Sequence, residues 1–406
     1  MQVGFSDMYP LTNAHRSLAS FRITLRLLGR HLVDLLRFGR ASRLTNGNAL
    51  TARLLKGAVD AGVTLWSEAH AVDLLSNDGA VKGAVVDHRG RRISITARRG
   101  VVLATGGFGA NEAMRREHIP LADAGWSLQP EGSQGDGITL ALAAGATLGT
   151  KNVANGIWAP MSAIPRKRRP LAPFPHLMFD RLMPGSIVVD GSGNRFVNEA
   201  THYQGFVDAM HRQGISLAFL IGDARHIRRY GMGLARPAPW PNGRLIRAGY
   251  LKRANSIAEL ATMLGVNGVT LKQTISEFNK HAGLGEDPAF NRGSGAYSRS
   301  MGDSTHMPNP NLAPLKNAPF YALELRPGVL STSLGVETDA SARVLDCNRK
   351  PIAGLFAVGI DMNSLWGGRY PAGGASLGAA LTFGYIVGRA LTAGWSSHNK
   401  IRTTNQ

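Results

Sequence analysis

The feature that most constrains the fold of this 406-residue chain is an apolar segment that ends in glycines. Val101–Ala104 is apolar at every position, which predicts a strand buried on both faces. Thr105, Gly106 and Gly107 follow it directly, and a helix is predicted to begin near Asn111. In a parallel sheet, small residues between a strand and the next helix leave room for a ligand at the strand's carboxyl end. The segment therefore predicts an α/β fold with a ligand site at one edge of its sheet.

Periodicity assigns the remaining elements. In the first hundred residues, two helices are predicted at 21–38 and 49–61. Short strands are predicted after them, at 63–66, 71–75, 81–87 and 92–97. A helix is predicted at 138–146, with Asp136 as its N-cap and with amides that could face an anion. Farther along the chain, helices are predicted at 256–264 and 269–281, and an ordered loop at 287–319. A strand at 354–359 and a final helix at 375–391 complete the prediction.

The charge of the chain first suggests a polyanionic partner. Its 46 Lys and Arg against 27 Asp and Glu give a formal net charge of +19. Nucleic-acid binding needs clustered positive charge. Only residues 166–169 form a dense basic run, and its position between two prolines favours a solvated loop. We therefore predict no nucleic-acid partner, although a basic surface can also attract an anionic cofactor or a membrane.

The segment 21–38 leaves two interpretations open. It is amphipathic, with four arginines on one helical face, Arg22, Arg26, Arg30 and Arg37. Such a helix could bind a membrane surface or a partner. We favour the alternative, in which the arginines are solvated and the opposite apolar stripe packs on a core.

Three simple absences exclude whole classes of protein. No apolar run reaches the ~18 residues of a membrane span, and the first ten residues lack a secretory pattern. We therefore predict a cytoplasmic protein without a transmembrane segment. The single cysteine, Cys347, excludes an internal disulfide and a cysteine-based metal site, and we predict no bound metal.

Taken together, several segments resemble the superfamily of flavin-dependent fumarate reductases and 3-ketosteroid dehydrogenases. They occur in family order and are Val101–Gly109, Gly132–Ala146, Arg195–Tyr203, Asn309–Tyr321 and Gly354–Gly388. The resemblance implies FAD as the cofactor and an α/β, Rossmann-like FAD-binding lobe at 1–162 and 331–406. An α+β cap domain, at 163–330, would be inserted between the two parts of the lobe.

The resemblance also assigns the residues that would contact the flavin. The dinucleotide is long, flat and anionic in its middle, so it needs glycines for close backbone approach and helix N-termini for its negative groups. The corresponding positions are Ala104, Thr105, Gly106, Gly107, Asp136, Gly359, Asp361, Ser376 and Leu377. The amides at Ser376 and Leu377 would stabilise negative charge on the reduced ring.

The glycine-rich loop before the last helix indicates the branch of the superfamily. Fumarate reductases place a substrate-binding arginine two residues before the paired glycines, where this chain has Pro371. The run from Tyr370 to Gly374 instead resembles the Tyr-Pro-x-x-Gly motif of 3-ketosteroid dehydrogenases. The resemblance implies that the Tyr370 hydroxyl and the Gly374 amide polarise a ketone oxygen. It further implies that Tyr203, in the pattern that begins at Arg195, removes the neighbouring proton as a tyrosinate.

The implied activity is dehydrogenation of a carbon–carbon bond next to a ketone, with a keto substrate and a separate electron acceptor as partners. Two alternatives stay open, a fumarate-reductase-like reduction of an activated double bond and a non-catalytic fragment. An unperturbed tyrosine has a pKa near ~10, so Tyr203 needs nearby positive charge or a hydrogen-bonded partner to act as a base at neutral pH.

Two departures from the family pattern stand out. Nothing before Thr105 supplies the Gly-x-Gly-x-x-Gly turn that grips the adenosine pyrophosphate. The chain looks like the family with roughly its first hundred residues absent, through truncation or a misplaced start codon, which predicts weak or absent FAD binding. In addition, Leu334 stands where the family has a glycine near the flavin.

Overall fold

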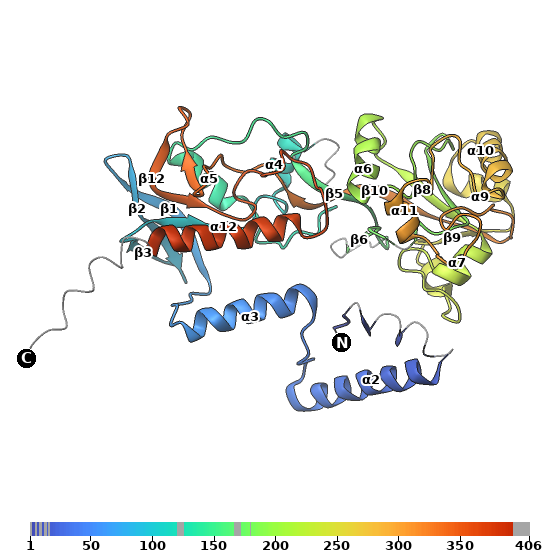
Figure 1. The fold of residues 1–406 in the computed structure, drawn as a ribbon, viewed down its shortest axis with the longest axis horizontal. Helices are drawn as coiled ribbons and strands as arrows, with labels where there is room; N and C mark the ends of the chain where they lie inside the picture. Colours follow the sequence, from blue (N-terminus) through green and yellow to red (C-terminus); the bar gives the residue numbers. More distant parts are fainter. Residues whose placement is uncertain are drawn as a thin grey trace, which may run out of the picture. The chain divides into compact units, whose positions relative to one another are not determined.

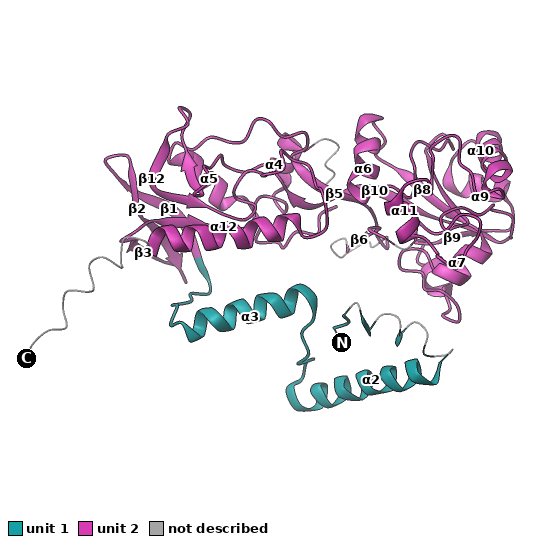
Figure 2. Cartoon of the chain, in the orientation of Figure 1, with its two compact units in different colours: residues 1–69 teal, residues 70–406 magenta. Residues whose placement is uncertain are grey.

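The computed structural model describes residues 2–4, 6–7, 10–11, 14, 17–119, 126–165, 172–178 and 180–392. The chain forms two compact units, residues 1–69 and 70–406 (Figure 2), and each is described by itself. The basic run at 166–169 lies outside the described residues. No helix within these ranges is long and apolar enough to cross a membrane.

Two helices of the first unit lie in the predicted places. They are α2 (Leu18–Phe38) and α3 (Asn46–Asp60). The Ser17 side chain caps the start of α2, and Gly39 ends it in the left-handed conformation. The favoured interpretation of α2, an apolar stripe packed on a core, stays a prediction. Within the described residues of its own unit, most apolar side chains of α2 are exposed and its only buried residues are Ser20 and Asp34.

The second unit begins with a small sheet of three strands in sequence order. They are β1 (Ala69–Asn77), β2 (Ala80–His88) and β3 (Arg91–Thr96), which confirms three of the predicted strands. Asp78 and Gly79, and then Arg89 and Gly90, form the two turns with positive φ. The strand predicted at 63–66 is wrong, because that segment is irregular.

The second sheet has the order β11-β12-β4 and holds the apolar segment that constrained the fold. Its strands are β4 (Val101–Leu103), β11 (Arg343–Leu345) and β12 (Pro351–Ala357). β12 and β4 are parallel, with Leu355 opposite Val101 and Ala357 opposite Leu103. The predicted FAD-binding lobe requires this pairing, while its boundaries stay a prediction. Burial on both faces was wrong for β4, because Val102 is 38% exposed.

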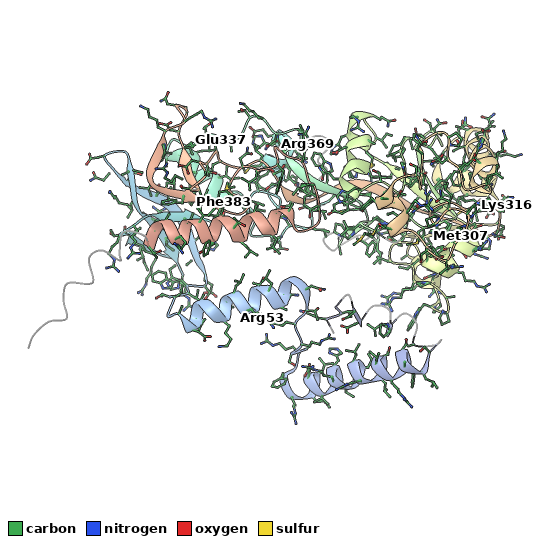
Figure 3. The ribbon with its side chains drawn as sticks, viewed as in Figure 1. Arg53, Met307, Lys316, Glu337, Arg369 and Phe383 are labelled. Carbon is green, nitrogen blue, oxygen red and sulfur yellow. The ribbon has the colours of Figure 1, made fainter. Side chains whose placement is uncertain are left out.

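Three helices accompany this sheet. They are α4 (Glu112–His118), α5 (Asp136–Ala143) and the long α12 (Ala375–Thr392), which lies along the sheet in Figure 1. The Asn111 side chain caps α4. Phe383, labelled in Figure 3, and Val387 pack α12 against Phe356 and Val358. The predicted N-cap of α5 was off by one residue, since Gly135 holds that position with φ 89° and Asp136 lies in the first turn.

The third sheet is the largest, with the order β6-β5-β10-β8-β7 and β9 paired to β10. Its strands are β5 (Gly156–Ser162), β6 (Phe174–Pro175), β7 (Ser186–Asp190), β8 (Ala218–Gly222), β9 (Lys252–Ala254) and β10 (Phe320–Thr332). One half of β10 pairs with β8 and the other with β5. This long strand therefore joins the outer part of the sheet to the strand that enters the site.

Six helices accompany this sheet. They are α6 (Tyr203–Arg212), α7 (Ala224–Tyr230), α8 (Gly243–Arg247), α9 (Ile257–Leu264), α10 (Gly268–Ala282) and α11 (Ala296–Met301). α9 and α10 confirm the predicted helices, and their apolar faces cover one side of the sheet at Ile187, Phe219 and Ile221. The predicted ordered loop at 287–319 contains the short helix α11.

Candidate active site

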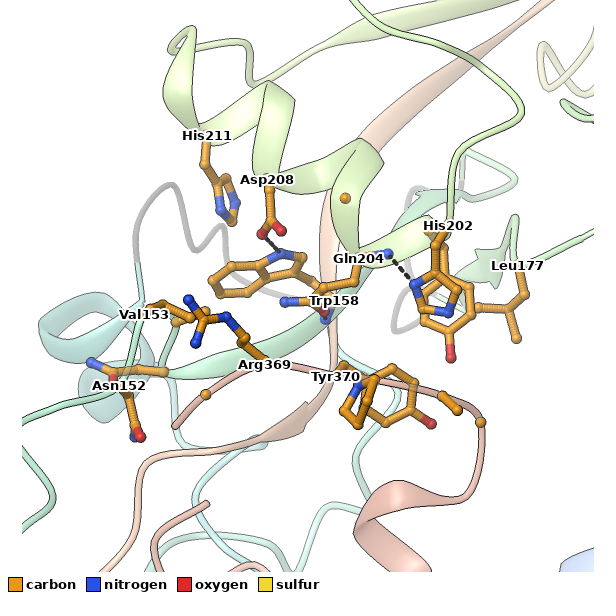
Figure 4. A pocket seen from close by; sticks show the side chains of 18 of the residues that line it. Asn152, Val153, Trp158, Leu177, His202, Gln204, Asp208, His211, Arg369 and Tyr370 are labelled. Carbon is orange, nitrogen blue, oxygen red and sulfur yellow. Dashed lines mark hydrogen bonds between the residues drawn. The ribbon is translucent and has the colours of Figure 1, made fainter. Parts of the chain in front are cut away.

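A cavity of about 1270 Å³ lies where β5, α6 and the loop before α12 meet (Figure 4). Both predicted catalytic tyrosines line it, Tyr203 from the start of α6 and Tyr370 from the glycine-rich loop. The segments are far apart in the sequence, so the fold itself brings these two side chains together.

The two tyrosines and Gly374 lie close together. The rings of Tyr203 and Tyr370 have centroids 5.9 Å apart. The amide of Gly374 donates to the Tyr370 hydroxyl at 3.3 Å. Pro371 favours extended backbone conformations at the preceding Tyr370. The structure thus brings the three predicted catalytic residues together, with Tyr370 beside both Tyr203 and Gly374.

The electrostatic setting of Tyr203 differs from the expectation for a tyrosinate. The side chain is only 9% exposed. Burial raises the pKa of Tyr203 above that of a free phenol, and the neighbouring Tyr370 raises the pKa further. The effect of Tyr370 on this pKa is opposite to the one that a base requires. Tyr203 is therefore a neutral phenol in this structure.

His202 lies against the same group. Its ring centroid is 3.9 Å from that of Tyr203, and its Nδ1 accepts the amide of Gln204 at 3.3 Å, which caps α6. Burial lowers the pKa of His202, and the charge of Arg181 lowers the pKa further. His202 is consequently neutral near pH 7, and it stacks on Tyr203 and caps the helix.

A buried cluster of charges fixes the segment that ends in Tyr203. Glu199 is fully buried and binds Arg195 at 2.7 Å and Arg292 at 3.3 Å. Arg195 also binds Asp287 at 2.8 Å, and the amide of Val188 donates to Glu199 at 3.1 Å. Burial would raise the pKa of Glu199, but the two arginines outweigh it and the pKa is lowered. The carboxylate is therefore charged and satisfied, as a buried ion must be.

Arg181 completes this support and was missed at the level of sequence. It is fully buried and donates to the carbonyls of Glu199 and Thr201, at 2.7 Å for Thr201, directly before His202 and Tyr203. Its guanidinium also stands 5.2 Å from the ring centroid of Phe206. Arg181 belongs to no motif, and a single sequence with 46 basic residues carries no signal that separates it from the others.

Three of the predicted cofactor segments meet through one buried carboxylate. Asp361 is fully buried and accepts hydrogen bonds from the Thr105 amide, from the Thr105 hydroxyl and from the Gly107 amide, the last at 2.8 Å. The Thr105 hydroxyl also accepts the amide of Gly137, in the first turn of α5, at 3.0 Å. Asp361 therefore holds the end of β4 and the start of α5 beside the end of β12.

Several close approaches in this region require glycine. A Cβ on Gly137 would stand 2.6 Å from Asp361 Oδ2, and one on Gly107, where φ is +67°, would stand 2.3 Å from the Thr332 hydroxyl. A second, smaller cavity of about 30 Å³ adjoins and is lined by Gly359, Ser376 and Tyr370 among others. Thr332 also lines it, and its buried hydroxyl has no hydrogen-bond partner among the described residues. The unsatisfied hydroxyl of Thr332 is a polar group that a ligand could bind.

Other predicted cofactor residues are less central. Ala104 and Asp136 are exposed, Leu377 is 49% exposed, and none of the three lines either cavity. Gly106 has φ +96° and continues the turn after β4. Leu334 is 3% exposed and packs into the core, so its side chain does not occupy the smaller cavity.

Comparison with known proteins decides the family. The sequence matches the family described as FAD binding domain over residues 5–377. The chain belongs to this FAD-binding family. The match confirms the predicted superfamily and FAD as the predicted cofactor. That Asp361 and Ser376 lie at the flavin end of the cofactor stays a prediction, and the sequence has no Gly-x-Gly-x-x-Gly turn for the pyrophosphate.

Relatives of this FAD-binding chain include two curated enzymes. It is 40% identical to 4-oxocyclohex-2-ene-1-carboxylate 5-dehydrogenase of Sinomonas cyclohexanicum, over 96% of this chain and 66% of the relative. It is 34% identical to a 3-oxosteroid 1-dehydrogenase of Mycolicibacterium smegmatis, over 86% of this chain and 62% of the relative. The chain thus spans just under two thirds of the length of these relatives.

A solved structure confirms the fold class. The crystal structure of a 3-ketosteroid Δ1-dehydrogenase from Sterolibacterium denitrificans, in complex with 1,4-androstadiene-3,17-dione, superposes with a TM-score of 0.84 at 33% identity. The superposition covers 95% of this chain and 70% of that structure. The α/β fold with its flavoprotein architecture is therefore confirmed.

Proposed function

We propose that this chain is a flavin-dependent dehydrogenase of a carbon–carbon bond next to the ketone of a cyclic substrate. The observation that carries the proposal is the placement of Tyr203 beside Tyr370 and the Gly374 amide at the large cavity. These residues supply two donors for a ketone oxygen and a phenol within reach of the neighbouring carbon.

The two donors would act on the ketone. When the carbon next to a ketone loses a proton, negative charge grows on the ketone oxygen. The Tyr370 hydroxyl and the Gly374 amide would both donate to this oxygen, which would take the place of their present mutual contact. Each such donor contributes roughly 2.7–4 kcal/mol to the stability of a transition state. Both donors lie on one short loop, so they would bind the oxygen together.

The proton would pass to or from Tyr203. A bound FAD would supply the acceptor for the hydride of the second carbon. With the loss of one hydride and one proton, the substrate would gain a carbon–carbon double bond. Tyr203 would take the proton, and its raised pKa makes its phenolate a strong but sparsely populated base. Dehydrogenation should therefore become faster as the pH rises above neutrality.

The same pKa supports a second candidate function, the reverse reduction of an activated double bond. A neutral phenol is ready to donate its proton to the carbon beside the ketone, and burial keeps Tyr203 neutral. Pro371 stands where a fumarate reductase has its substrate-binding arginine, so the electron-withdrawing group would again be a ketone. The two directions use the same residues and differ in the protonation state of Tyr203 and in the redox state of the flavin, which would have to be reduced in order to supply the hydride for the reduction.

The substrate class is narrowed by the relatives. Both curated relatives act on a ring that carries an oxo group, a cyclohexene carboxylate in one and a steroid in the other. A cavity of about 1270 Å³ has room for either class. The ketone is the shared element, and it matches the two donors at Tyr370 and Gly374.

The experiment compares two substrates on flavin-loaded protein with an artificial electron acceptor. We expect reduction of the acceptor with 4-oxocyclohex-2-ene-1-carboxylate and none with the analogue in which a hydroxyl replaces the ketone. Equal turnover of both compounds would contradict a role for the ketone. A colourless protein that takes up no flavin and turns over neither compound would favour the non-catalytic alternative.

A further inference from the structure

The large cavity has a cationic part beside the tyrosines. Arg369 and Arg212 line it with exposed side chains, whereas Asp208 is the only carboxylate among the described residues that line it. The guanidinium of Arg369 contacts no carboxylate or other hydrogen-bond acceptor within the described part of the chain. A free cation on the wall of a cavity is an available site for an anion.

Asp208 does not neutralise Arg369. Its carboxylate accepts the indole N–H of Trp158 at 2.7 Å, and Arg212, one helical turn away, is the cation that lowers its pKa. Burial nevertheless raises the pKa of Asp208 overall, which makes its carboxylate easier to protonate than that of a free aspartate. Arg369 is therefore left without a counter-ion.

The other titratable groups on this wall add no negative charge. Burial lowers the pKa of His211 to about 4, so its ring is neutral near pH 7, and it packs on Trp158 with centroids 4.4 Å apart. Its buried Nδ1 has no hydrogen-bond partner among the described residues. His118 and His202 also line the cavity, and the pKa of His202 is likewise lowered by burial. Among the described residues that line the cavity there are thus two arginines and one carboxylate.

Arg369 and Tyr370 are neighbours in sequence but serve different parts of the cavity. Pro371 favours an extended backbone at Tyr370, and successive side chains of an extended chain point to opposite sides. In Figure 4, Arg369 is directed toward Val153 and Trp158, while Tyr370 is directed toward His202. A small ring held between them could meet a hydroxyl at one side and a guanidinium at the other.

We propose that Arg369 binds the carboxylate of a small cyclic keto acid whose ketone is held by Tyr370 and Gly374. This inference rests on the proposed function and selects one of its two substrate classes. A carboxylate would pair with the guanidinium through charge-assisted hydrogen bonds. A neutral steroid would instead place apolar rings against this unpaired cation and remove its water without compensation. Arg369 thus determines specificity, while Tyr370 and Gly374 act on the ketone.

Arg369 has a competing role that the experiment must exclude. It also lines the smaller cavity together with Gly359 and Ser376, where the flavin ring is expected. A guanidinium that contacts the flavin would affect cofactor retention and the flavin spectrum, and it would do so for every substrate. A guanidinium that binds substrate would affect the binding of carboxylate substrates and leave that of their neutral esters unchanged.

The first test measures binding without turnover. Calorimetry on flavin-loaded protein should show that cyclohexanecarboxylate binds and that its methyl ester binds weakly or not at all. Arg369→Leu should weaken binding of the acid roughly 10- to 100-fold, as expected for loss of a charge-assisted pair, and Arg369→Lys should restore part of it. The matched control is Arg244→Leu, at an exposed arginine of α8 that does not line the cavity.

The second test measures turnover and separates the two proposals. With 4-oxocyclohex-2-ene-1-carboxylate and its methyl ester, Arg369→Leu should raise KM for the acid and leave the ester unchanged, with an unaltered flavin spectrum. An acid-to-ester ratio that does not change, or an equal loss on both compounds with loss of flavin, would overturn the role of Arg369. If the unsubstituted protein binds the acid through Arg369 but dehydrogenates neither compound, the proposed function fails and the carboxylate site stands.

Discussion

The two halves of the candidate site are built in opposite ways. The half that carries Tyr203 rests on buried charges, with Arg181, Glu199 and Arg292 all fully buried and bound to several groups. The half that carries Tyr370 is an exposed loop, in which the Gly374 amide donates to the Tyr370 hydroxyl and a Cβ on Gly374 would meet open space. The comparison indicates that contacts within the protein fix the half that carries Tyr203. We expect the half that carries Tyr370 to gain further contacts when substrate or flavin binds.

The largest effect is expected from breaking the buried charge cluster. Glu199→Gln keeps the shape of the side chain but leaves Arg195 and Arg292 without their shared carboxylate. Removing one partner of a buried ion pair costs about 3–5 kcal/mol. We therefore expect a loss of this size in the free energy of unfolding, measured by denaturant titration of the full chain.

The control for this prediction is an exposed pair. Glu277→Gln removes the surface partner of Lys280 at 2.6 Å, and both side chains are largely solvated. No measurable change in unfolding is expected for this variant. If both variants unfold at the same denaturant concentration as the unsubstituted chain, the buried cluster does not hold the half that carries Tyr203.

The second prediction concerns the loop half and chemistry rather than stability. Tyr370→Phe removes one of the two donors to the proposed ketone oxygen while the ring still packs. Loss of one such donor should lower kcat about 10²- to 10³-fold with the flavin spectrum unchanged. Tyr385→Phe, at a 65% exposed tyrosine on α12, should keep full activity. Near-normal turnover by Tyr370→Phe on every accepted ketone would show that the loop has no such role.

The third prediction uses pH to probe the half that carries Tyr203. Burial would raise the pKa of Asp180, but His176 and the amides of Arg181 and Gly233 outweigh it and lower the pKa to about 2. A carboxyl with a lowered folded-state pKa stabilises the fold above its unfolded pKa of ~3.9. This contribution, on the order of 2 kcal/mol, should disappear as the pH falls from about 4 to about 2. Asp180→Asn should remove that part of the pH dependence of unfolding, and an unchanged acid profile would contradict the assignment.

Sequence reasoning predicted many of the elements because their signals are local. The apolar run that ends in Thr105 and Gly106, the helices α9 and α10, and the small-residue helix α12 can each be recognised from a few neighbouring residues. The exposure of Val102 could not be predicted in this way. It depends on which parts of the chain cover that face of β4, and a local sequence pattern does not contain this information.

In the candidate site, too, the features with a local sequence signal were predicted and those that depend on long-range contacts were not. Tyr203, Tyr370 and Gly374 belong to short motifs, so their contact followed once the motifs were recognised. The raised pKa of Tyr203 did not follow, since it arises from burial beside Tyr370. The roles of Arg181 and Arg369 could not be predicted from the sequence either. Arg181 acts through the carbonyls of Glu199 and Thr201, about twenty residues along the chain. Arg369 stands out only because its guanidinium has no partner among the described residues.

The smallest effect is expected from two adjacent glycines of the loop half. Gly373 and Gly374 are both exposed, and a Cβ on either would meet nothing within 4 Å. They differ in backbone conformation, because only Gly374 has a positive φ, of +92°. Gly374→Ala should therefore cost about 1–2 kcal/mol of unfolding free energy from backbone strain alone. Gly373→Ala should be neutral or slightly stabilising, because alanine restricts the unfolded chain. If the two variants unfold alike, the conformation of Gly374 is not fixed by the fold, and the loop half takes its shape only with a ligand bound.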